Sequence, residues 1–350
     1  MDTTLLLKAL IAIAPVIVLL LVFDRLDIFD LVTFREIALL LLAGGAIAII
    51  ALGANTQAMD GFPIGFSAYS RYVAPIIEES LKATPIVVLF AINRLGFKLD
   101  SAIAGFAVGA GFSVIENGWF LHLLGDANMS AWIVRGFGTA VMHGGATAIF
   151  AVISHEFAEH QSEANAASYR FNPLIFVPGL AAAIFTHSAF NHFPNQPIVA
   201  MVLTLLFVPM TLFVIFARSE LATHRWLKAD HDAHRKTLED IRAGRFLDTS
   251  AGQAIAGIVR PLKAVKVDDV VAHVALSTEL IVRAEEIMLA GQEGRVVEGE
   301  AGEREKFAAL DALERRLGPK VLAATRPHSG ISRNDVWELG RLRAQVNRRR

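Results

Sequence analysis

Long apolar runs separated by short polar segments dominate the first two thirds of the chain. A helix needs about 18 or more apolar residues to cross the hydrocarbon core of a bilayer. Runs of this length predict membrane-spanning helices at 3–23, 37–54, 71–93, 101–124, 131–154, 174–193 and 197–218. Polar turn residues lie between them. The pattern therefore predicts an all-α, polytopic membrane bundle of about seven transmembrane helices.

The pattern changes after residue 218. Segments 219–244 and 303–318 have the periodicity of amphipathic helices, and the second is expected to end at Gly318-Pro319. We therefore expect a transmembrane domain over 1–218 and a soluble, mostly helical C-terminal region over 219–350. Charge follows the same division. Residues 1–218 hold 10 Lys and Arg and 14 Asp and Glu, whereas residues 219–350 hold 23 and 20.

Composition narrows the functional classes. Hydrophobic residues make up 54% of the chain and the mean hydropathy is +0.47, which agrees with lipid as the main solvent. The net charge of −1 offers no electrostatic argument for a nucleic-acid partner. The chain has no cysteine, which excludes disulfides, thiol catalysis and cysteine-based zinc sites.

Basic residues predict the orientation in the membrane. Alternate connections between the predicted helices fall on opposite faces, and the face with more Lys and Arg is normally cytoplasmic. One face receives Arg25, Arg35, Arg94, Lys98, Arg170 and the basic start of the tail, whereas the other receives Arg71 and Arg135, with Lys8 near the N-terminus. We therefore expect the N-terminus outside and the C-terminus in the cytoplasm.

Ionisable and amide side chains interrupt four consecutive predicted spans. A charged group at the bilayer centre costs about 2.5–3.5 kcal/mol on insertion scales, so such groups are expected to face the bundle interior and to pair. Glu78 and Lys82 are four residues apart on one helical face and are expected to form an ion pair. The complete set is Glu78, Glu79 and Lys82, then Glu116 and Asn117, then His143, then His187 and Asn191.

These groups are expected to lie at similar depths. With a rise of about 1.5 Å per residue, Glu78, Glu116 and His187 each lie about 10 Å from the same face of a core about 30 Å thick. His143 lies about 18 Å from that face. Helices of alternating direction thus bring three of these groups into one half of the membrane and His143 close to the midplane, which predicts a shared pocket.

A carboxylate beside imidazoles is suited to general-base activation of water. We expect one glutamate to take the proton and a His or Asn side chain to hold the developing oxyanion. Among Glu78, Glu79 and Glu116, Glu78 is the favoured base. Glu116 is equally compatible with a structural role. This chemistry fits hydrolysis of a peptide bond within or next to the bilayer, without a cofactor.

Four motifs then resemble one family. The segments EESLK (78–82), FSVIEN (112–117) and HSAFN (187–191), together with the helical His143, are similar to those of the PrsW family of bacterial membrane proteases. That family is grouped with CAAX prenyl endopeptidases and bacteriocin-processing proteins. The resemblance covers residues 70–195 and not the tail.

The resemblance implies metal-independent, glutamate-type proteolysis of a membrane-anchored protein, since PrsW-like proteins cleave a membrane-anchored anti-sigma factor. The glutamate pair of the family corresponds to Glu78 and Glu79, and its H-x-x-x-N to His187 and Asn191. Prenyl endopeptidases have F-x-x-x-H where this chain has Phe112 and Glu116, so prenyl-peptide processing is disfavoured. His143 is the candidate for the missing imidazole.

The sequence is also compatible with two other functions. A proton-coupled transporter or channel would also use buried Glu and His, although the chain lacks the repeat typical of transporters. A zinc-dependent membrane hydrolase could use Glu, His143 and His187 as ligands, although no H-E-x-x-H motif is present. For the tail, regulation, a cytosolic partner and self-association are all compatible with the sequence.

Overall fold

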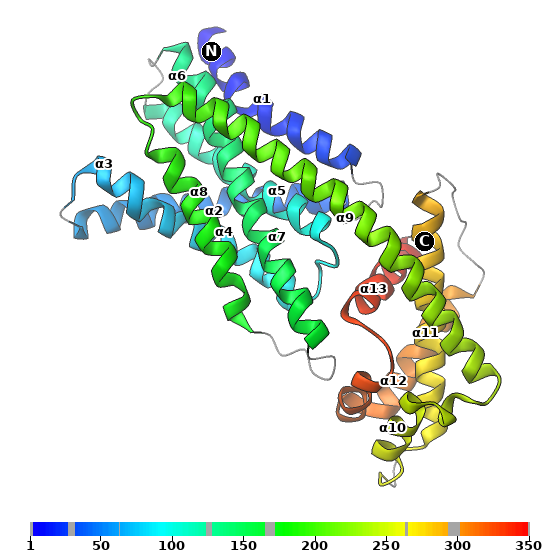
Figure 1. Ribbon diagram of the computed structural model, residues 1–350. Helices are drawn as coiled ribbons and strands as arrows, with labels where there is room; N and C mark the ends of the chain where they lie inside the picture. Colours follow the sequence, from blue (N-terminus) through cyan, green and yellow to red (C-terminus); the bar gives the residue numbers. More distant parts are fainter. Residues whose placement is uncertain are drawn as a thin grey trace. The chain divides into compact units, whose positions relative to one another are not determined.

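The computed structural model describes residues 3–26, 32–62, 64–123, 128–164, 172–262, 265–292 and 302–348. These residues form helices and no strand, so the all-α prediction is confirmed (Figure 1). The chain divides into two compact units. The first, called the membrane unit, comprises 1–159 and 171–220, and the second, called the tail unit, comprises 160–170 and 221–350.

The membrane unit consists of long helices joined by short connections. Short helical segments precede three of them and continue directly into α4, α7 and α8: α3 and η1 (Phe66–Ala68 and Tyr69–Val73), α6 and η2 (Met129–Ile133 and Val134–Thr139), and η3 (Pro173–Phe176). The long helices are α1 (Thr3–Leu26), α2 (Phe34–Gly61), α4 (Ala74–Ala91), α5 (Lys98–Leu123), α7 (Ala140–Ala164), α8 (Val177–Asn191) and the first part of α9 (Pro197–Arg242).

Within the described part of the chain, five helical segments are long and apolar enough to cross a membrane: Phe34–Gly61, Lys98–Leu123, Met129–Ala158, Pro173–Asn191 and Pro197–Val214. The protein is therefore a multi-pass membrane protein. The two other expected spans are also helical. The apolar part of α1 runs over Leu6–Val22, and α4 carries the charged Glu78, Glu79 and Lys82. A total of seven crossings stays a prediction.

Helix α5 lies at the centre of the membrane unit. In an apolar stretch of 18 residues of α5, 83% is buried inside the protein, compared with 22% of the corresponding stretch of α9. Large side chains of α8 and α9, among them Phe185, Phe207 and Met210, are exposed. Because exposed large apolar side chains are normal where lipid is the solvent, α9 and part of α8 fit the lipid-facing side of the bundle.

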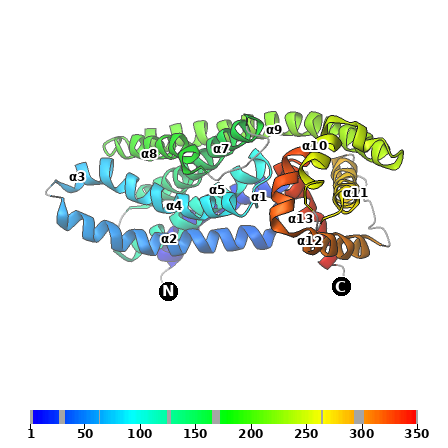
Figure 2. The same cartoon turned by 90° about the horizontal axis from the view of Figure 1, so that it is seen from below.

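Glycines let α5 approach its neighbours closely. A Cβ added at Gly109 would lie 2.2 Å from the carbonyl oxygen of His143 on α7, and one at Gly111 would lie 2.0 Å from that of Leu41 on α2. Figure 2 shows α2 and α5 running along each other. The glycine-rich pattern of α5 therefore forms the close helix packing that membrane proteins achieve with small residues.

Helix α9 differs from the prediction of a span followed by a separate amphipathic helix. It runs without interruption over 46 residues, Pro197–Arg242. The apolar part of α9 ends at Val214, and the next Gly or Pro in the sequence is Gly244, which has a positive φ of 70°. One helix therefore begins in the membrane unit and ends in the tail unit.

The tail unit is a packed helical domain. It contains the end of α9, η4 (Phe246–Asp248), α10 (Ser250–Val259), α11 (Val267–Gln292), α12 (Glu303–Thr325), η5 (Arg326–His328) and α13 (Arg333–Arg348). Phe246, Ile255 and Val274 belong to one buried cluster, and Leu280 and Phe307 to another. The expected break at Gly318-Pro319 is confirmed, because Gly318 adopts a non-helical φ of 75° within α12.

Candidate active site

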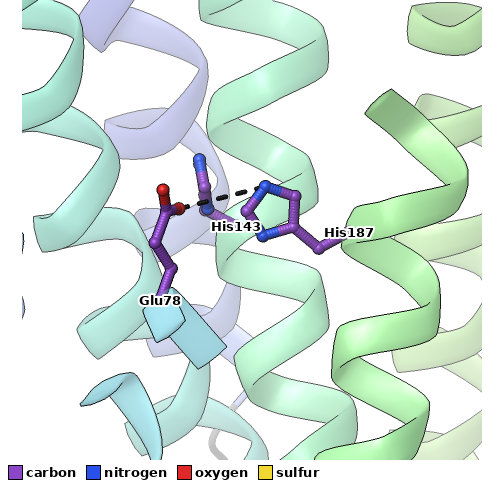
Figure 3. A group of neighbouring side chains, drawn as sticks. All are labelled: Glu78, His143 and His187. Atoms are coloured by element: carbon purple, nitrogen blue, oxygen red, sulfur yellow. Dashed lines mark ion pairs between the residues drawn. The ribbon is translucent and has the colours of Figure 1, made fainter. Parts of the chain in front are cut away.

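Three helices bring a carboxylate and two imidazoles together in the interior of the membrane unit. Glu78 lies on α4, His143 on α7 and His187 on α8, and their side chains point toward one another (Figure 3). One ligand atom of each lies within 4.8 Å of the others. The three residues are 7%, 1% and 3% exposed. The predicted convergence of polar groups from separate spans is thus present.

The two oxygens of Glu78 have different surroundings. Oε1 accepts a hydrogen bond of 3.0 Å from Nδ2 of Asn55 on α2, and the hydroxyl of Tyr69 donates to Oδ1 of Asn55 at 2.9 Å. Oε2 is buried without a hydrogen-bond partner and lies 3.9 Å from Nε2 of His187. The hydrogen bond at Oε1 therefore fixes the orientation of the carboxylate, and Oε2 is available to bind a proton or a cation.

Glu79 holds His187 from the opposite side. Its Oε1 accepts a hydrogen bond of 2.8 Å from Nδ1 of His187. Because Nδ1 donates to a carboxylate, Nε2 carries the lone pair of the neutral ring. Nε2 of His187 and Oε2 of Glu78 are then two acceptors facing each other inside the protein.

Lys82 pairs with Glu79, which corrects the expected ion pair with Glu78. Its Nζ lies 2.5 Å from Oε1 of Glu79, and neither side chain is more than 1% exposed. Both Glu78 and Glu79 are within one helical turn of Lys82, and the i, i+3 arrangement is the one adopted. Lys82 Nζ also donates to Nδ1 of His143 at 2.8 Å and lies 4.6 Å from the ring centre of Phe112.

Glu116 supports His143. Since an ammonium group only donates, Nδ1 of His143 accepts from Lys82 and Nε2 carries the proton. Nε2 donates to Oε2 of Glu116 at 3.2 Å, and the same oxygen accepts from Nη2 of Arg135 at 3.1 Å. Glu116 is thus paired with Arg135 and His143. Asn117 accepts from Nε of Arg135 at 2.9 Å.

Asn191 lies one turn beyond His187 on α8. Its amide nitrogen donates to the carbonyl oxygen of Ser70 at 2.8 Å, and the neighbouring Ser188 hydroxyl donates to that of Arg71 at 2.6 Å. Both acceptors lie in η1, where the wider helical turn frees carbonyl groups. In this structure Asn191 therefore connects α8 to η1, and its role as an oxyanion donor stays a prediction.

Sequence reasoning missed three residues of this network. Asn55 lies one position beyond the expected end of its span, and Tyr69 lies before the expected start of the next. Arg135, interpreted from the sequence as a loop anchor, lies in the π-helix η2 and binds Glu116. The sequence did offer one indication that Arg135 belongs to the site, because it is an isolated Arg about two turns before His143 on the same continuous helix.

The donor set of the cluster fits a divalent metal ion. Glu78 supplies a buried oxygen without a hydrogen-bond partner, and His187 supplies a nitrogen lone pair directed toward it. Each imidazole is backed by a carboxylate, Glu79 behind His187 and Glu116 behind His143, as is usual for metal-binding histidines. The site is also compatible with acid–base chemistry alone, because Lys82 already occupies Nδ1 of His143.

The fold and the site together define a multi-pass membrane protein with a buried carboxylate–imidazole centre, the arrangement expected of an intramembrane hydrolase. Residues 33–217 match the model of a family described as "PrsW family intramembrane metalloprotease". Because the match covers more than half of the 350 residues, the chain belongs to the PrsW family of intramembrane proteases. No curated protein and no solved structure matches the chain.

Proposed function

We propose that the chain is an intramembrane endopeptidase that hydrolyses a peptide bond of a membrane-anchored protein at the centre formed by Glu78, His143 and His187. The observation that carries this proposal is the buried Oε2 of Glu78, which has no hydrogen-bond partner and faces Nε2 of His187. Two facing acceptors need a cation or a polarised water between them. Either one supplies the chemistry of hydrolysis.

In the favoured form of the proposal, Glu78, His143 and His187 hold a divalent ion, in agreement with the printed description of the family. A bound divalent ion supplies Lewis acidity, which polarises a carbonyl group and acidifies water. Glu79 keeps the Nδ1 proton on His187 so that Nε2 is available, and Asn55 holds the plane of the Glu78 carboxylate. Holding His143 in this way requires Lys82 to move from Nδ1, or the ring to rotate.

A metal-free form is the second candidate, and the contact between Lys82 and His143 favours it. Here Glu78 accepts a proton from water, and the water oxygen forms a bond with the carbonyl carbon of the scissile peptide. The resulting oxyanion accepts hydrogen bonds from the imidazoles or from Asn191. The C–N bond then breaks, and the proton passes from Glu78 to the leaving amine.

Metal depletion of the purified protein separates the two forms. In the metal-dependent form, a membrane-permeant chelator abolishes cleavage of a membrane-anchored substrate, and added Zn²⁺ restores it. Unchanged activity after depletion, with metal content confirmed by elemental analysis, supports the form with Glu78 as the base. Full activity of Glu78→Gln with or without metal contradicts both forms.

The substrate class and the location complete the proposal. His143 and His187 lie on helices long and apolar enough to span a membrane, so the substrate is a membrane-anchored protein, of which an anti-sigma-type regulator is an example. The excess of Lys and Arg on one face supports a bacterial cytoplasmic membrane with the N-terminus outside and the C-terminus inside. The tail unit is then available to a cytosolic partner or to self-association. A link to CAAX prenyl endopeptidases belongs to the same proposal.

A further inference from the structure

A second cluster of acidic and imidazole side chains lies in the tail unit, which the family match at 33–217 does not cover. Asp230 and His234 are one turn apart on α9, Glu285 lies on α11 and Asp335 on α13. One ligand atom of each lies within 4.8 Å of the others. Glu285 and Asp335 are 0% exposed and His234 is 4% exposed. The cluster is therefore a buried centre shared by three helices.

Hydrogen bonds fix part of this cluster. Nδ1 of His234 lies 2.8 Å from Oε1 of Glu285, and Nε2 of His234 lies 3.4 Å from Oδ2 of Asp335. His231 contributes Nδ1, 3.2 Å from the other oxygen of Glu285. The backbone nitrogen of Ser332 also donates to Oδ2 of Asp335, which fixes this carboxylate at the start of α13.

The remaining oxygens have no hydrogen-bond partner. Oδ2 of Asp230, Oδ1 of Asp335 and both oxygens of Glu338 are buried without one. Glu338 is 0% exposed and lies one turn after Asp335, near the charges of Asp230 and Glu285. Leaving a buried carboxylate oxygen unsatisfied costs free energy, and buried oxygens without a partner on residues of this cluster and on Glu338 beside it point to a coordinated cation.

We propose that Asp230, His234, Glu285 and Asp335, with Glu338 beside them, form a binding site for a divalent metal ion. Carboxylate oxygens with one imidazole suit ions such as Zn²⁺ and Mn²⁺. The ligands come from α9, α11 and α13, so the ion joins three helices. Two of the ligands, His234 and Glu285, are 51 positions apart in the sequence. The site is distinct in sequence and in unit from the Glu78 centre.

Metal binding by the full-length protein in detergent tests this proposal, using protein with its purification tag removed. The His187→Ala variant is the starting protein, because it lacks one ligand of the proposed catalytic centre. After chelator treatment and dialysis against Zn²⁺ or Mn²⁺, elemental analysis is expected to find about one equivalent of ion per chain. A protein that binds neither ion has a cluster satisfied by protons alone, and the proposal is then wrong.

Variants of the cluster locate the ion. In the His187→Ala background, Glu285→Gln is expected to lose the bound ion, whereas Glu286→Gln is expected to keep it. Glu286 is the next residue on α11, and its side chain is 47% exposed in an ion pair with Arg283. If Glu285→Gln does not fold, Asp230→Asn in the same background takes its place, and it is also expected to lose the bound ion. Retention of the ion by the folded variant overturns the proposal.

Discussion

Glu79 and His187 are joined by a hydrogen bond of 2.8 Å between Oε1 and Nδ1, which connects α4 to α8 inside the membrane unit. The bond keeps the Nδ1 proton in place and directs Nε2 toward Glu78, 3.9 Å away. Adjacent glutamates on one helix therefore have different surroundings. Glu79 is held between Lys82 and His187, whereas Glu78 keeps one oxygen without a hydrogen-bond partner. We expect Glu79 to position the imidazole of His187 and Glu78 to take part in the hydrolysis.

Replacing Lys82 with Met tests the buried ion pair. The variant leaves Glu79 without its ammonium partner, and breaking a buried pair typically lowers the free energy of unfolding by about 3–5 kcal/mol. Denaturation of the detergent-solubilised protein measures the change. Lys98→Met is the matched control in the same unit, because the ion pair of Lys98 with Glu156 is partly exposed and is expected to contribute about 0–1 kcal/mol. Equal stability of wild type and Lys82→Met contradicts the pair.

Replacing Gly109 with Ala tests the packing of α5 against α7. The added Cβ would lie 2.2 Å from the carbonyl oxygen of His143, so the helices must separate and His143 must move. We expect a loss of about 1–3 kcal/mol in stability together with lower activity. Gly118→Ala on the same helix is the control, since a Cβ there has nothing within 4 Å. If both variants behave alike, close approach at Gly109 does not position His143.

Replacing Arg135 with Lys tests the support of Glu116. The guanidinium bridges Asn117 and Glu116 through Nε and Nη2, and an ammonium group cannot reproduce this fork. Because Glu116 holds Nε2 of His143, we expect kcat to fall about 10–100-fold. KM is expected to stay close to that of wild type, since Arg135 acts through the imidazole. A change confined to KM would instead assign Arg135 to substrate binding.

The orientation in the membrane can be measured with reporters that are active on one side only. A fluorescent protein fused after Arg350 is expected to fluoresce in the cytoplasm. Alkaline phosphatase is expected to be active when fused at the N-terminus, on the outer side. The opposite pattern reverses the predicted orientation but leaves the geometry of the site unchanged.

The sequence was enough to predict that the polar side chains converge, but not which of them form hydrogen bonds and ion pairs with one another. Spacing and apolar runs were enough to predict that Glu78, His143 and His187 converge, because each of them lies well inside an expected span. The prediction that Lys82 pairs with Glu78 was wrong. Glu78 and Glu79 both lie within one turn of Lys82, and only the packing of His143 and His187 decides between them.

Residues outside the expected spans could not be found in this way. Asn55 binds Glu78 because α2 extends to Gly61, and Tyr69 binds Asn55 because η1 adds a wider turn before α4. Neither extension has an apolar pattern. The packing of the tail was equally hidden, because the cluster around Glu285 combines three helices that are far apart in sequence. Long-range helix packing decides such contacts, and periodicity does not report it.

The most direct test of the proposed active site is comparative proteomics of membrane fractions from cells that carry wild-type protein or Glu78→Gln at equal abundance. The substitution keeps the size of the side chain and the acceptor for Asn55 but removes the charge at Oε2. The account predicts that a membrane-anchored protein accumulates uncleaved in the variant and that its fragments appear only with wild type. Identical cleavage patterns, with Glu78→Gln folded and inserted, would contradict the account.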